Sequence, residues 1–213
     1  MKNLLTTGNS LLLFCVATAF AVTACSTTGM QRSQDVQSSM QTVDNDIKSA
    51  VVQLDAINSS LSELTKTGQA DMKKAFDLYS ENASEIKKME KDFEKHASQM
   101  EASGKNYFAE WDKDSEQYDN ADIQRQSNER REALRETYDK IAQNNVGVKD
   151  AFQTYVSDIN EIEEFLSNDL TSQGIDSIEP ISDEVVRNGN RLKNELQNLQ
   201  SAIEQARIEM RQS

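Results

Sequence analysis

The residues best suited to recognition chemistry lie between positions 107 and 138. This stretch holds the only tryptophan of the chain, Trp111, and several arginines follow a turn-prone Asp-Asn-Ala-Asp segment at residues 119–122. Tryptophan, tyrosine and arginine are the residue types that dominate the energetics of protein interfaces. The predicted partner-binding residues are Trp111, Tyr118, Arg125, Arg131 and Arg135.

The same stretch also has a purely structural interpretation, which we favour. In a helical hairpin that turns near Asn120, the arginines would lie over Trp111 or bond to Asp112 and Asp114 on the opposite helix. Neighbours on one helix would pair as well, because Arg125 and Glu129 are four residues apart. Such a pair stabilises a helix by about 0.2–0.5 kcal/mol. In this interpretation the arginines hold the hairpin together.

Catalysis and metal binding find little support in the residue types. His96 is the only histidine, so a histidine relay within one chain is excluded. Acidic residues alternate over positions 112–116 as in a calcium loop, but Gln117 and Ile123 stand where that loop needs glycine and glutamate. The sequence has no nucleophile motif and no phosphate-binding loop. We therefore expect no enzyme activity, no cofactor and no metal.

The first 24 residues have the form of an export signal. Lys2 precedes an apolar run over residues 11–22, which is shorter than the roughly 20 residues of a membrane-spanning helix. The run ends in Val22-Thr23-Ala24-Cys25, which resembles the bacterial lipobox. We predict that residues 1–24 are a lipoprotein signal peptide and that Cys25 carries the lipid anchor. The alternative is an ordinary secretory signal that is cleaved elsewhere.

The residue after Cys25 bears on localisation. Aspartate at this place favours the inner membrane in double-membraned bacteria, and this chain has Ser26. We therefore expect the protein at the periplasmic face of the outer membrane, with residues 25–30 as a lipidated tether. Cys15 leaves with the signal, so the mature chain forms no disulfide. Loss of Lys2 leaves 22 Lys and Arg against 36 Asp and Glu; this charge of −14 opposes attraction to nucleic acid or anionic lipid.

The rest of the sequence is typical of long helices. Apolar residues recur in alternating steps of four and three, the heptad pattern of helices that pack along a narrow seam. Four such seams cover residues 36–64, 72–111, 134–166 and 185–210. We predict that Thr67-Gly68 ends the first helix and that Asn120 caps the third. Residues 168–179 are predicted to be a connection, and Pro180 to begin the fourth helix.

The helix lengths predict the architecture. The two central helices, of about 50 residues each, would run roughly 75 Å, and the outer two cover only part of that length. We predict an all-α domain over residues 31–213: an antiparallel bundle, or coiled coil, of four long helices whose central pair extends as a hairpin arm over about 104–134. The second helix should continue through Gly104 to about Tyr118, since an interior glycine costs only about 1 kcal/mol. Homodimerisation through the arm stays open.

One set of residues also points to a known family. The set comprises Glu110-Trp111, Glu116-Gln117-Tyr118, Asn120-Ala121, Arg125, Ser127, Tyr138, Phe152, Leu170 and Gly174-Ile175. This pattern resembles the bacterial family called domain of unknown function 2959, over most of the mature chain. The resemblance implies an all-helical coiled-coil fold and supplies no substrate, cofactor or catalytic residue.

Taken together, these observations predict an outer-membrane-anchored periplasmic lipoprotein that acts as a coiled-coil scaffold or adaptor. The lipid on Cys25 would hold it to the membrane, and the arm would meet a protein partner. The alternative is a chaperone-like protein, or a binder of small apolar ligands, because methionines such as Met40 and Met72 offer adaptable apolar contacts. Methionines at helical spacing are more often core residues.

Overall fold

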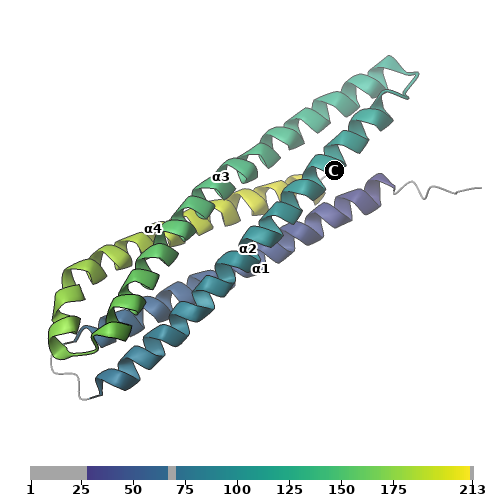
Figure 1. The fold of residues 1–213 in the computed structure, drawn as a ribbon. Helices are drawn as coiled ribbons and strands as arrows, with labels where there is room; N and C mark the ends of the chain where they lie inside the picture. Colours follow the sequence, from purple (N-terminus) through teal and green to yellow (C-terminus); the bar gives the residue numbers. More distant parts are fainter. Residues whose placement is uncertain (1–27, 67–70, 212–213) are drawn as a thin grey trace, which may run out of the picture.

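The computed structural model describes residues 28–66 and 71–211, and these residues form four long helices without a strand (Figure 1). The helices are α1 (Gly29–Leu64), α2 (Met72–Ser115), α3 (Ala121–Asn168) and α4 (Ser172–Arg211). The predicted signal peptide, the lipidation site Cys25 and the predicted cap at Gly68 lie outside the described residues.

The four helices form an antiparallel bundle. Each helix packs against two others: α1 and α3 both contact α2 and α4. The α1–α2 and α3–α4 connections lie together at one end, which we call the closed end, and the turn between α2 and α3 lies at the other end, which we call the tip (Figure 1). The predicted all-α bundle with an extended central pair is confirmed.

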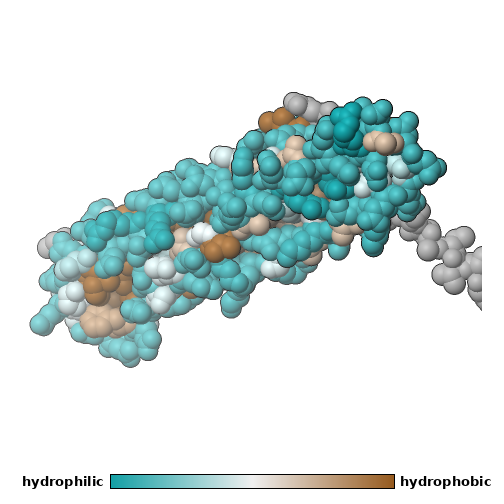
Figure 2. All heavy atoms as spheres, turned by 90° about the horizontal axis from the view of Figure 1, so that it is seen from above, coloured by the Kyte–Doolittle hydropathy of each residue, from teal (hydrophilic) through white to brown (hydrophobic). Residues whose placement is uncertain are grey.

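The heptad seams become the core of the bundle. In α1 and α4 every residue of the predicted seam is buried. In α3 the only exception is Asn145, whose side chain donates a hydrogen bond to Glu101 of α2 (2.6 Å). The surface seen in Figure 2 is mostly hydrophilic, with apolar residues in separate small patches. The apolar contacts are thus distributed along the whole length of the bundle.

Gly104 lies inside α2 and does not interrupt the helix. A Cβ atom at this position would come within 2.1 Å of Cζ of Tyr138, so the missing side chain makes room for the tyrosine ring. The ring is buried, and its hydroxyl donates a hydrogen bond to the carbonyl of Met100. Gly104 therefore lets α2 and α3 approach each other closely where the arm begins.

At the tip, the predicted start of α3 is correct and the predicted end of α2 is not. Asn120 caps α3 as expected: its side chain accepts hydrogen bonds from the amides of Asp122 (2.9 Å) and Ile123 (3.2 Å). However, α2 ends at Ser115 and not near Tyr118. The hydroxyl of Ser115 bonds to the carbonyl of Asp112 (2.9 Å) and competes with the helical pattern there.

The prediction of a connection over residues 168–179 is wrong. Only residues 169–171 separate the two helices, and Pro180 lies inside α4. The hydroxyl of Thr171 accepts a hydrogen bond from the amide of Gly174 (3.0 Å) and so starts the helix early. Burial of Ile175 and Ile178 then holds the first turns of α4 against the bundle. Two apolar residues were too few to reveal a seam in the sequence.

The arm is also shorter than predicted. The prediction left residues 104–134 uncovered, but Arg32 near the start of α1 forms an ion pair with Asp114 at the end of α2. Thr28 caps α1, which thus begins at Gly29, within the expected tether. On the other side, Thr137 of α3 still bonds to Glu209 of α4 (2.7 Å). Only the turn and the first turns of α3 extend beyond this cover, and none of residues 121–133 is buried.

Candidate functional site

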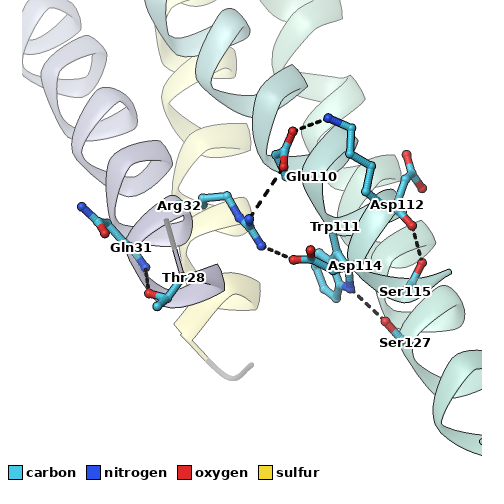
Figure 3. A network of polar contacts seen from close by, with 10 residues as sticks. Thr28, Gln31, Arg32, Glu110, Trp111, Asp112, Asp114, Ser115 and Ser127 are labelled. Atoms are coloured by element: carbon cyan, nitrogen blue, oxygen red, sulfur yellow. Dashed lines mark hydrogen bonds and ion pairs between the residues drawn. The ribbon is translucent and has the colours of Figure 1, made fainter. Parts of the chain in front are cut away.

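Trp111 connects α2 to α3 near the tip. Its indole Nε1–H donates a hydrogen bond to the hydroxyl of Ser127 on α3 (2.9 Å; Figure 3). The guanidinium of Arg130 lies 5.6 Å from the centre of the indole ring. Tyr107, one turn earlier on α2, packs edge-on against the same ring at 5.5 Å. Three residues of the hairpin, Ser127, Arg130 and Tyr107, therefore contact the indole of Trp111.

Asp112 is the second connection between the two helices. Its carboxylate oxygens lie 2.9 Å from Nε of Arg131 and 3.0 Å from Nη2 of Arg135. Arg131 also donates to the hydroxyl of Ser115 (2.8 Å), and Arg135 lies 5.3 Å from the ring centre of Phe108. The Arg135 contact is a charge-assisted hydrogen bond, which is about twice as strong as a neutral one, and the Arg131 contact is an ion pair. The structural interpretation of the arginines is confirmed at Trp111 and Asp112.

Asp114 was expected to face the arginines of α3, and this expectation is wrong. Its carboxylate bonds to Arg32 of α1, which also lies 4.0 Å from Glu110 (Figure 3). The side chain of Arg32 is only 15% exposed. This contact could not be predicted from the sequence, because Arg32 precedes the first seam residue of α1 and belongs to no periodic pattern.

Two of the five predicted partner-binding residues remain at the surface of the tip. Tyr118 lies in the turn and is 41% exposed. Arg125 is exposed and pairs only with its own helix neighbours, Asp122 (3.3 Å) and Glu129 (3.2 Å). Ile123, in the first turn of α3, is 53% exposed and adds an apolar residue that the sequence prediction missed. We call Tyr118, Ile123 and Arg125 the tip surface.

A cleft opens where all four helices come close together below the tip. Its lining includes Met30 and Arg32 of α1, Tyr107 and Trp111 of α2, Arg130 of α3 and Met210 of α4, and its volume is about 630 Å³. We call it the tip cleft. It could not be predicted from the sequence, because it depends on where α1 begins and α4 ends.

The electrostatics of the tip cleft are set by two arginines. Burial raises the pKa of the Tyr107 phenol, and the positive charges of Arg130 and Arg32 oppose that shift. Both guanidinium groups therefore act on the same phenol. Arg32 is neutralised by Asp114, whereas Arg130 forms no ion pair with any residue that the structure describes. The guanidinium of Arg130 instead makes a cation–π contact with the Trp111 ring.

The remaining candidate groups form no catalytic or metal site among the described residues. His96 is half-buried between α1 and α2, with Nδ1 2.7 Å from a carboxylate oxygen of Asp46. Within residues 28–66 and 71–211, no three or more His, Cys, Asp or Glu side chains are arranged to hold a metal ion. The helices of this part of the chain also lack a segment long and apolar enough to span a membrane.

Comparison with known proteins gives one match. The model of the family described as "Protein of unknown function (DUF2959)" matches residues 23–212. Neither a curated protein nor a solved structure matches the chain. Because the family model covers almost the whole sequence, the chain belongs to the DUF2959 family, as its residues around Trp111 indicated.

Proposed function

We propose that this protein is a lipoprotein of the periplasmic face of the outer membrane, and that it acts as a helical scaffold or adaptor without catalysing a reaction. The lipobox at residues 22–25 supports the anchor, and Ser26 supports the outer membrane. The observation that carries the adaptor role is the tip surface, where Tyr118, Ile123 and Arg125 are exposed at the end of a braced hairpin.

The bracing of the hairpin favours this role. Trp111 and Asp112 fix α2 to α3 just below the tip, so the tip surface is held in place before any partner binds. A preorganised surface loses less conformational freedom on binding, and side-chain ordering alone costs about 0.5–1.5 kcal/mol per residue. Tyrosine and arginine are also the residue types that contribute most to interfaces.

The position of the anchor adds a constraint on the partner. Cys25 is three residues before the helix cap Thr28, a distance of at most about 10 Å in an extended chain. α1, which Thr28 caps, begins at the same end of the bundle as the tip (Figure 1). The tip surface would therefore meet its partner close to the membrane, and the closed end would point away from it.

A pair of variants tests the adaptor role. Proteins bound to this chain are crosslinked to it in cells and recovered with it. Replacing Tyr118 and Arg125 together by alanine should abolish recovery of the partner. The helical content should stay unchanged, because neither side chain contributes to the core. The matched control replaces Lys88, an exposed residue of α2 in the body of the bundle, by alanine. If the double variant recovers the same partner as the control, the proposed role of the tip surface is wrong.

A further inference from the structure

The tip cleft combines an aromatic wall with a cation that has no acidic partner. Trp111 and Tyr107 meet edge to face at 5.5 Å, and Met30, Met210 and Tyr118 of the tip surface also line the cleft. Arg130 lies over Trp111 at the same place. Most arginines near the tip are neutralised by carboxylates, so Arg130 is available for an anion from outside the described chain.

The polar groups around Arg130 also favour an anion. The Tyr107 hydroxyl makes no hydrogen bond within the described residues, and the charges of both Arg130 and Arg32 act on it. A negatively charged head group near Arg130 could therefore accept hydrogen bonds from a guanidinium and a phenol together. Asp114 is the acidic group of the lining, and Arg32 already neutralises it.

We propose that the tip cleft binds an amphiphile with one anionic head group, a carboxylate or a phosphate, and an apolar chain. Its head would lie against Arg130, and its chain would lie along Trp111, Met30 and Met210. The volume of about 630 Å³ lies within the range of roughly 300–1,000 Å³ that is usual for small-molecule sites. This inference goes beyond the adaptor role, since it needs neither the lipid anchor nor a protein partner.

Two sources could supply such a head group: a free single-chain amphiphile or the surface of an anionic bilayer. The charge of the protein decides between them. With 22 basic against 36 acidic residues after loss of Lys2, the protein as a whole is repelled by a negatively charged surface. A free molecule carries a single charge, so this repulsion is far weaker for it, and in the cleft it meets the unpaired Arg130. We therefore favour the free amphiphile.

Trp111 provides the probe for a test, because it is the only tryptophan and lines the cleft. The mature chain, residues 25–213 with Cys25→Ser, is titrated with dodecanoate below its micelle concentration. Binding is followed by tryptophan fluorescence and by calorimetry. Dodecyltrimethylammonium is the cationic counterpart with the same chain length. Circular dichroism checks that the helical content stays constant.

The key variant is Arg130→Gln, and its matched control is Arg187→Gln in α4, an exposed arginine that does not line the cleft. We expect saturable binding of dodecanoate but not of the cationic amphiphile. Affinity should fall about tenfold in Arg130→Gln, as for loss of a charge-assisted hydrogen bond, and stay unchanged in Arg187→Gln. Equal affinity of the two variants, equal binding of both amphiphiles, or loss of helix on titration would overturn the proposal. Binding to phosphatidylglycerol vesicles alone would overturn the free amphiphile as the ligand.

Discussion

Arg131 and Arg135 show that residue type alone does not separate a binding site from a structural contact. Both were candidates for a recognition surface because arginine is common at interfaces, yet both bind Asp112 of their own hairpin. The same holds for Trp111, whose indole bonds to Ser127. Residue types indicate what chemistry is available, and only the helix register shows which groups are already engaged.

Glycine at position 104 gives a prediction at the same scale. Gly104→Ala should lower the free energy of unfolding by about 1–3 kcal/mol, because the new Cβ would collide with the ring of Tyr138, which is buried and packs against Phe108 of α2. Urea unfolding followed by circular dichroism measures the change.

The matched control for that variant is Gly147→Ala in α3. Its Cβ would meet only the carboxylate end of Glu195, at 3.0 Å, and this flexible side chain can move away. Alanine is also the better helix former, by about 1 kcal/mol, so this variant should be as stable as the wild type or more stable. If both variants lose stability equally, a collision with the Tyr138 ring is not the cause of the loss in Gly104→Ala.

At the scale of helices, periodicity predicted more than local signals did. The seams of α1 and α4 predicted their buried faces correctly, because a repeat of seven residues leaves few alternative faces. The start of α4 was missed, because Thr171 and two isoleucines make no repeat. The first two residues of α1, Gly29 and Met30, were assigned to the tether for a similar reason: Arg32, not an apolar seam, binds the start of α1 to α2. The tip cleft is lined by side chains from all four helices, so no periodic pattern along one helix could predict it.

The α1–α4 interface contains a buried acidic group with a testable pH dependence. Asp44 is 6% exposed; burial raises its pKa, but hydrogen bonds from Lys48 and Gln200 outweigh burial, so that the pKa lies below the ordinary 3.8. A carboxyl whose pKa is lowered by folding stabilises the protein above its ordinary pKa, and this contribution is lost as the pH falls below it.

We therefore predict that Asp44→Asn is less stable than the wild type at pH 7 and that the difference shrinks as the pH falls below 3.8. Chemical unfolding of both proteins between pH 7 and pH 2 measures it. The other carboxyls titrate in both proteins, so their contributions to the pH dependence cancel in the difference between the two free energies of unfolding. A difference that is constant over this range would show that Asp44 does not stabilise the interface through its charge.

At the scale of the whole molecule, the fold separates two ends. The closed end holds two connections, whereas the tip end holds the tip surface, the tip cleft and the start of α1 (Figure 1). α1 has 36 residues, so these ends are about 54 Å apart along it. A lipid anchor on Cys25 would hold the functional end at the membrane and leave the closed end far from it.

The anchor itself is tested with the two cysteines of the chain. Cys25→Ser should abolish incorporation of labelled fatty acid and release the protein from the membrane fraction. Cys15→Ser, within the predicted signal peptide, is the matched control and should change neither. Metabolic labelling and membrane fractionation measure both effects. Continued labelling of Cys25→Ser would place the lipid elsewhere, or show that the lipobox interpretation is wrong.

The central claim is that the tip surface meets a protein partner, and in-cell photocrosslinking tests it most directly. A photoreactive residue is placed at Tyr118, Ile123 or Arg125, with Lys88 as the control position on the body of the bundle. We predict that the three tip positions crosslink to the same membrane-proximal protein and that Lys88 does not. Crosslinks to a second copy of this chain alone, or none at any tip position, would contradict the adaptor role.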